Sequence, residues 1–75
     1  MGEKLKEYLV IYEEADGDWS AYAPDVPGCI AAADTREEVE KLFREALEAH
    51  LEIMRESGET IPEPRTQAGH VAVAA

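Results

Sequence analysis

The stretch that most constrains the fold is residues 24–35, with the sequence PDVPGCIAAADT. Its two prolines restrict the backbone φ angle and Gly28 is free to adopt a positive φ, so residues 24–28 are typical of a stiff turn. The apolar run that follows has the length of one short strand, and the Asp-Thr pair at its end is typical of a helix start. This stretch therefore predicts one strand of a small sheet that leads directly into a helix.

The predicted helix begins at Thr35. Thr35 and Glu38 have the Thr-x-x-Glu spacing of a capping box, in which the threonine hydroxyl accepts from the Glu38 amide and the carboxylate accepts from the Thr35 amide. Gly58 is expected to end the helix in the left-handed conformation. Between these ends, apolar residues recur at three- and four-residue steps and predict a stripe that faces the sheet: Val39, Leu42, Phe43, Ala46, Leu47, His50, Leu51 and Met54.

Two further extended segments precede the strand at residues 29–33. Residues 8–12 are apolar at every position and rich in aromatic and β-branched side chains, which is typical of a strand in the interior of a sheet. Residues 16–18 favour a hairpin turn, and residues 19–23 resume an extended pattern. The three segments together predict an antiparallel meander.

A fourth strand is predicted after the helix. Residues 59–69 contain two prolines and are typical of an extended connection, and residues 70–74 have the pattern of a short strand. A right-handed crossover through the helix would place that strand beside the first one, in the spatial order 3-2-1-4. The sequence therefore predicts a single domain over residues 1–75 of the α+β class, a β-β-β-α-β two-layer sandwich.

Size and cysteine content limit how such a domain is stabilised. The core of a chain of 75 residues rarely contributes more than about 3–5 kcal/mol, and disulfides, a metal or self-association usually supplement it. With one cysteine and no paired Cys/His ligands, self-association is the remaining option, and a reduced, cytoplasmic location is expected. Residues 1–7 are charged rather than a signal segment, and no apolar run approaches the roughly 18 residues of a membrane span.

The charge indicates which class of partner suits the chain. Seventeen acidic residues against seven basic ones give a net charge of −10, and the excess lies within residues 1–59. This charge repels a phosphate backbone, so direct nucleic-acid binding is not expected, whereas it would attract a basic protein. The alternative interpretation is that the charge only keeps a small domain in solution.

The residue types that often carry chemistry have structural interpretations here. His50 is a lone histidine at the edge of the helix stripe, and Cys29 begins a predicted strand with no base beside it, so both are expected to pack in the fold. Asp25 and Asp34 occupy a turn and a helix entry, where short carboxylates accept backbone hydrogen bonds. No catalytic residue, metal ligand or cofactor is predicted.

The order of these elements resembles one known family. Its pattern matches the aromatic strand at residues 8–12, the motifs Pro24-Asp25, Pro27-Gly28-Cys29, Asp34-Thr35 and Glu37-Glu38, and Ile61-Pro62 with Pro64 after the helix. By this order and spacing the chain is identified as a member of the HicB-like antitoxins over roughly residues 8–65. The resemblance implies a partial ribonuclease H-like fold, in which the family motif is mainly structural: Pro24, Asp25, Pro27, Gly28, Cys29, Asp34, Thr35 and Glu38.

The resemblance also implies a function in a type II toxin–antitoxin system. HicB proteins bind and occlude HicA, a small basic ribonuclease toxin, and an acidic domain suits that partner. Partner contacts are expected from Tyr22, on the opposite face of its strand from Trp19, and from the helix residues Glu37, Glu45 and Glu48. The alternative is a solitary HicB-like oligomeric module with another protein-binding or regulatory role. Complete HicB antitoxins usually continue into an operator-binding domain, and no C-terminal DNA-binding domain is expected here.

An enzymatic function is not expected from the same comparison. Full ribonuclease H enzymes hold two Mg²⁺ ions in a carboxylate cluster that includes an aspartate on the first strand. Residues 8–12 contain no aspartate, so a cluster would have to come from Asp25, Asp34 and glutamates of the helix. The sequence therefore favours a binding protein over a nuclease.

Self-association is predicted from the faces of the sheet. One helix covers only one face of a four-stranded sheet, yet residues 8–12 are apolar on both faces. An uncovered apolar face is usually buried by another chain. We therefore expect a homodimer or a higher homo-oligomer, assembled through the sheet or through an edge strand.

Overall fold

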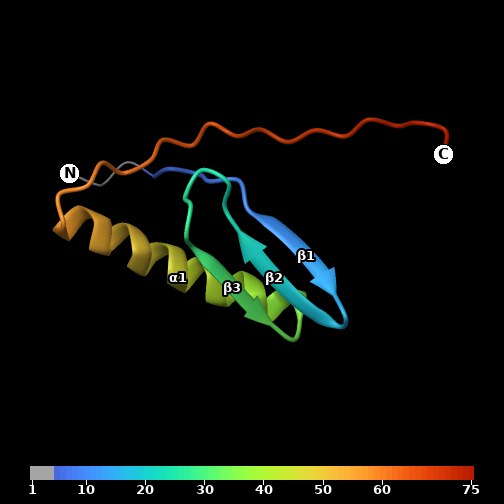
Figure 1. Cartoon of the computed structure of the whole chain (residues 1–75), viewed down its shortest axis with the longest axis horizontal. Helices are drawn as coiled ribbons and strands as arrows, with labels where there is room; N and C mark the ends of the chain where they lie inside the picture. The colour runs from blue at the N-terminus through green and yellow to red at the C-terminus, as the bar shows by residue number, and fades with distance from the viewer. Residues whose placement is uncertain (1–4) are drawn as a thin grey trace.

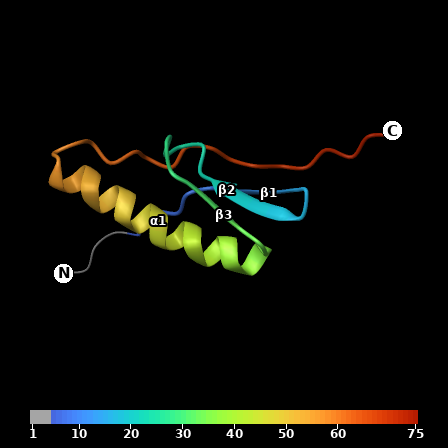
Figure 2. The same ribbon diagram turned by 60° about the horizontal axis from the view of Figure 1, so that its bottom comes forward.

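A computed structural model describes residues 5–75, so residues 1–4 of the charged N-terminal segment lie outside the described part. The described chain forms β1 (Ile11–Ala15), β2 (Asp18–Tyr22), β3 (Ile30–Ala33) and α1 (Arg36–Glu56), in this order. The strands pair antiparallel in the order β1-β2-β3, and α1 lies across one face of the sheet (Figure 1, Figure 2). The predicted α+β class, the antiparallel meander and the helix are confirmed.

The hairpin between β1 and β2 fixes which side chains share a face of the sheet. Asp16 and Gly17 form its two-residue turn with φ angles of 54° and 83°, the pattern of a type I′ turn. In the resulting register Ile11, Tyr22 and Ile30 are aligned across the three strands. This row, here called the outer row, lies on the face that α1 does not cover, because the alternate residues of the strands pack against the core.

The core lies between α1 and the sheet, and α1 packs mainly against β2 and β3. The turn before β3, the strands and the helix all contribute to its buried residues, which are Ala21, Ala23, Val26, Cys29, Val39 and Phe43. Tyr8, Val10 and Tyr12 are half-buried at one side of this cluster. Leu42, which the predicted stripe includes, is 44% exposed, so the apolar stripe of α1 is narrower than expected at that position.

Both ends of α1 have the predicted capping residues. The Glu38 amide donates to Thr35 Oγ1 over 3.1 Å, but the Glu38 carboxylate accepts from the Thr35 hydroxyl (3.0 Å) rather than from the Thr35 amide. At the other end Gly58 has a φ of 77°, and the Glu59 amide donates to the Met54 carbonyl over 2.9 Å, which is a Schellman motif. Within residues 5–75, no helix has the length and apolar character that a membrane crossing requires.

Two predictions about the sheet are wrong. The first strand begins at Ile11 rather than at residue 8, and it lies at an edge of the sheet instead of in its interior. The C-terminal strand beside strand one does not form, because residues 59–75 contain no helix or strand. The reason is that residues 62–66 are hydrogen-bonded to Tyr8 and Asp25, and the chain beyond them leaves the sheet (Figure 1).

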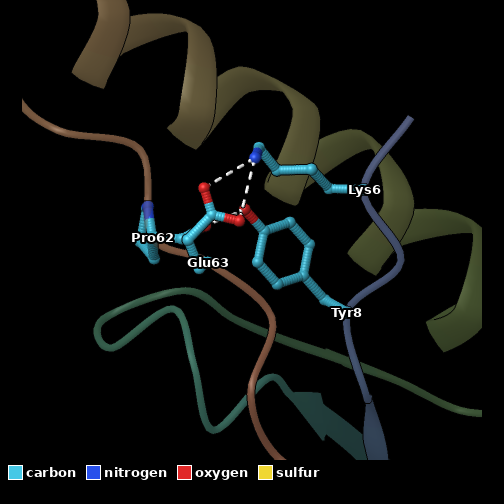
Figure 3. Close-up of polar contacts among 4 residues, drawn as sticks. All are labelled: Lys6, Tyr8, Pro62 and Glu63. Carbon is cyan, nitrogen blue, oxygen red and sulfur yellow. Dashed lines mark hydrogen bonds and ion pairs between the residues drawn. The ribbon is translucent and has the colours of Figure 1, made fainter. Parts of the chain in front are cut away.

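The connection after α1 is held beside the N-terminal extended segment. The Lys6 amino group donates to both carboxylate oxygens of Glu63, over 2.9 and 3.1 Å, as the dashed lines in Figure 3 mark. The Tyr8 hydroxyl donates to the Pro62 carbonyl over 2.5 Å. Burial raises the pKa of Tyr8, so its hydroxyl keeps the proton that it donates. These contacts place residues 62–63 next to residues 6–8.

Candidate protein-interaction surface

The turn at residues 24–28 is linked by Asp25 to the C-terminal part of the chain. The Asp25 carboxylate accepts from the backbone amides of Arg65 and Thr66, both at 2.8 Å, and from the Thr66 hydroxyl at 2.7 Å. The hydrogen bonds from Thr66 and then from Arg65 hold the pKa of Asp25 below its usual value. Asp25 is therefore a structural anchor for residues 65–66.

The other conspicuous residues of this turn also contribute to packing. Gly28 has a φ of 89°, which glycine adopts without strain, and a Cβ at this position would lie 4.0 Å from Cε1 of His50. Cys29 is 6% exposed, and burial raises the pKa of its thiol, so the sulfur is a poor nucleophile at neutral pH. The structure thus places Cys29 in the core, where the sequence predicts a small buried hydrophobe.

The carboxylates that a nuclease centre would need have other surroundings. Asp25 is engaged by Arg65 and Thr66, and Glu38 caps the helix with Thr35, while Asp34 is exposed just before it. In the part of the chain that the structure describes, no group of three or more His, Cys, Asp or Glu side chains is arranged to hold a metal ion.

Acidic side chains predominate on the outward face of α1, which also carries the exposed Lys41 and Arg44. The predicted partner contacts Glu37, Glu45 and Glu48 are all exposed on this helix. Arg36 is already engaged, because it pairs with Glu40 and its guanidinium lies 3.6 Å from the centre of the Tyr12 ring. Arg36 is therefore directed toward Glu40 and Tyr12, and the neighbouring Glu37 is exposed in the first turn of α1.

A second acidic surface, which was not predicted as a contact, lies at the tip of the β1–β2 hairpin. Its four exposed carboxylates are Glu13, Glu14, Asp16 and Asp18. The signal that could have identified it is the concentration of acidic residues on both sides of a predicted turn, because a tight turn brings the ends of its two strands together.

Tyr22 is separated from the helix glutamates by the thickness of the domain. It lies in the middle of the outer row, between Ile11 and Ile30, on the sheet face opposite α1. Ile30 is 68% exposed, so this face presents apolar area to the surroundings. The predicted contact residues therefore belong to two surfaces, the helix face and the outer face of the sheet.

A third surface is an open groove of about 490 Å³ between α1 and the N-terminal residues 5–12. Its apolar lining comes from the extended segment and from the helix, and includes Tyr8, Val10, Tyr12, Phe43, Leu47 and Leu51. The groove lies at this edge because α1 packs mainly over β2 and β3, while β1 meets the helix at Tyr12, whose ring lies next to Arg36. Neither the strand pattern nor the helix stripe predicts this opening.

The fold and these surfaces define a small α+β domain with an outer sheet face, an acidic helix and an edge groove that are all open to contact. The chain belongs to the family of HicB-like antitoxins of bacterial toxin–antitoxin systems, which matches over residues 8–74. No solved structure matches the chain at a significant level, and the ribonuclease H-like relation stays a prediction.

Individual relatives come from a bacterium, a phage and an archaeon. The chain is 31% identical over 64 residues to Antitoxin HicB 2 of Photorhabdus laumondii, covering 85% of this chain and 46% of that protein. It is 36% identical over 55 residues to a 14.9 kDa protein in the rep-hol intergenic region of Haemophilus phage HP1, covering 73% of this chain and 41% of the relative. A UPF0150 protein of Thermoplasma acidophilum is 30% identical over 58 residues, covering 77% of this chain and 84% of that protein. The chain thus spans less than half the length of the first two relatives.

Proposed function

We propose that this domain is the toxin-binding part of an antitoxin, and that it neutralises a small basic ribonuclease of the HicA type by occluding it. Membership of the HicB-like family and the relative named Antitoxin HicB 2 support a role in a toxin–antitoxin pair. The identity of the toxin rests on the charge of this chain, because a net charge of −10 suits a basic, RNA-binding partner.

The observation that carries the proposal is the exposed row of carboxylates on α1. Glu37, Glu45 and Glu48 project from a rigid helix, where they would meet cationic side chains that otherwise contact RNA phosphates. Such charges raise the association rate with a basic partner and disfavour nucleic acid as a competitor. Tyr22 offers a second contact on the outer row.

We infer that the domain acts by binding rather than by catalysis. Asp25 is occupied by three hydrogen bonds and Cys29 is buried as a thiol, which supports structural roles for both. The test is incubation of the protein with RNA and with an RNA·DNA hybrid in Mg²⁺ or Mn²⁺. Hydrolysis that disappears in Asp25→Asn or Asp34→Asn would overturn this inference.

The antitoxin role is tested with the product of a neighbouring reading frame that encodes a small basic protein. Co-expression should relieve the growth arrest caused by that toxin, and the two proteins should co-purify. The triple variant Glu37→Gln, Glu45→Gln, Glu48→Gln is expected to bind at least about tenfold more weakly, since each charge contributes to steering and to contact.

A matched control removes the same number of charges from the hairpin tip, with Glu13→Gln, Glu14→Gln and Asp16→Asn. Equal losses in both triple variants would show that net charge rather than the helix face attracts the partner. If no adjacent HicA-like product binds at all, the proposal fails, and the solitary oligomeric module with another partner becomes the better account.

We also propose that the domain self-associates. The support is the outer row, in which Ile11, Tyr22 and Ile30 place apolar and aromatic area on a sheet face that the helix leaves uncovered. Light scattering at micromolar concentration should give the mass of a dimer or a larger assembly. A stable monomer under these conditions would contradict self-association.

A further inference from the structure

The strand β1 lies at an edge of the sheet and is apolar only at its start. Among the described residues, the sheet order β1-β2-β3 leaves one side of β1 without a neighbouring strand, and the apolar residues 8–12 run into its first two positions. Bare edges are normally protected by charge or by cover. Glu13 and Glu14 protect the second half of this edge, whereas its apolar first half has no charged residue and can accept another strand.

The C-terminal residues 67–75 have the opposite property, since they form an extended segment without a neighbour. Every residue from 65 to 75 is exposed, with Val71 at 87% and Val73 at 74%. Among the described residues, none of residues 67–75 makes a hydrogen bond to the sheet. Val71 and Val73 alternate with alanine and would lie on one face of a strand.

The groove beside β1 fits such a segment in shape and charge. Its apolar floor is made by Val10 and Tyr12 with Phe43 and Leu47, on the side of the sheet where a fourth strand would extend the helix-facing layer. Three acidic and three basic residues lie along it: Glu7, Glu40, Glu48, Lys6, Arg44 and Arg55. Residues 67–75 carry no acidic or basic side chain apart from His70. The groove has as many acidic as basic residues along it, so it neither attracts nor repels this segment by charge, although the whole protein is acidic.

The segment leaves its own sheet rather than turning back to it. Asp25 holds Arg65 and Thr66, and beyond this anchor both Figure 1 and Figure 2 show the chain projecting past the rest of the molecule. The radius of gyration is 14.5 Å, against about 11 Å for a compact domain of this length. Nine extended residues reach about 30 Å, which is long enough to lie along a second sheet.

We propose that residues 70–74 of one copy add as a fourth strand to the free edge of β1 in a second copy, with Val71 and Val73 in the groove. Reciprocal exchange gives a closed two-fold dimer, in which each copy both donates and receives a strand. The inference deepens the self-association proposed above and does not depend on the toxin.

The first experiment compares the full chain with a variant that lacks residues 70–75. Light scattering and sedimentation should show the full chain as a dimer and the truncated one as a monomer, with the same helical circular dichroism. The double variant Val71→Asp, Val73→Asp should weaken dimerisation at least about tenfold, because it places charges in an apolar groove. Its matched control, Ala68→Asp with Ala75→Asp, adds the same charge outside the strand and should leave the dimer intact.

The second experiment tells exchange between copies from pairing within one chain. In a Cys29→Ala background, one tagged chain carries Tyr12→Cys and a second, differently tagged chain carries Val73→Cys. A short bismaleimide should join the two tags. Ile30→Cys in place of Tyr12→Cys is the control, and it should not be joined because β3 lies at the other edge of the sheet.

Three outcomes would overturn the inference. A dimer that survives deletion of residues 70–75 but dissociates in Ile30→Asp would assign self-association to the outer row alone. A cross-link within a single chain that carries both Tyr12→Cys and Val73→Cys, with none between the two singly substituted chains, would show that the strand returns to its own sheet. A monomer at micromolar concentration for every variant would remove both this inference and the self-association proposal.

Discussion

Asp25 lies in a motif made of residue types that often serve catalysis, yet both of its carboxylate oxygens accept hydrogen bonds within the fold. Oδ2 accepts the amides of Arg65 and Thr66, and Oδ1 accepts the Thr66 hydroxyl. A carboxylate with several donors is stabilised in its charged form, which is why its pKa is lowered. The position of residues 65–66 therefore depends on an ionised Asp25.

Acidification should release this anchor. Because the folded-state pKa is depressed, the stabilisation is complete above the ordinary value of about 3.9 and is lost as the pH falls through the lower folded value. We expect the hydrogen-exchange protection factors of the Arg65 and Thr66 amides, measured by NMR, to fall in that acidic range. The protection factors of the β2 amides serve as the reference, because they report on unfolding of the whole domain.

Variants separate this effect from general acid unfolding. Asp25→Asn should give low protection at Arg65 and Thr66 at neutral pH as well, with little further pH dependence. Asp34→Asn removes a charge at an exposed site and should leave both amides protected. Unchanged protection in Asp25→Asn would mean that the carboxylate does not hold this segment.

At the scale of the elements, the beginning of α1 is defined by the side chain of Thr35. Its hydroxyl accepts from the Glu38 amide and donates to the Glu38 carboxylate, so one side chain satisfies a free backbone amide and orients the acid of the first turn. Glu37 and Glu38 also place negative charge where the helix dipole is positive.

Removal of this cap should destabilise the domain measurably. Thr35→Ala is expected to lower the free energy of unfolding by about 1 kcal/mol, since a free amide at the helix start loses its acceptor. Urea denaturation followed by circular dichroism measures the change. Thr35→Ser keeps the hydroxyl and should stay close to the parent, and an equal loss in both variants would rule out the cap as the cause.

The contact of α1 with the sheet is concentrated in few residues. Phe43 is 2% exposed, whereas its neighbour Leu42 is 44% exposed. Phe43→Ala should cost about 3–5 kcal/mol, which is comparable to the whole contribution of so small a core, and the variant should be largely unfolded. Leu42→Ala should cost less than about 1 kcal/mol. Similar losses in the two variants, measured by urea denaturation, would contradict the helix orientation described here.

At the scale of the whole molecule, charge acts at longer range than any one contact. Much of the acidic charge lies on the exposed faces of α1 and the hairpin tip, and among residues 5–75 no charged side chain is fully buried. A field of one sign steers a partner of the opposite sign and is screened by salt.

The proposed association with a basic toxin should therefore depend strongly on ionic strength. We expect the association rate constant, measured by stopped-flow fluorescence, to fall at least about tenfold between roughly 10 mM and 150 mM salt. The dissociation rate should change much less. In the triple helix variant Glu37→Gln, Glu45→Gln, Glu48→Gln the salt dependence should be weaker. A rate that is insensitive to salt would argue against electrostatic steering.

Local pattern was sufficient for much of the fold. The turn at Asp16 and Gly17, the cap at Thr35 and the end at Gly58 were predictable because each depends on residues within a few positions of one another. The prediction failed for the strand at residues 70–74, since its pairing depends on a partner that local pattern does not identify. For the interaction surfaces, the helix glutamates were predictable as exposed residues, whereas the hairpin tip and the groove were not selected.

The sequence by itself determined the order of strands and helix, the ends of α1, the acidic character and the family. Tertiary structure decided that β1 is an edge strand, that a groove opens beside it, and that Asp25 binds residues 40 and 41 positions away. The physical reason is how far apart along the chain the interacting residues lie. Turns, caps and amphipathic stripes arise from neighbours along the chain, whereas edges, grooves and long-range hydrogen bonds arise from how distant segments pack, which leaves no periodic trace in the sequence.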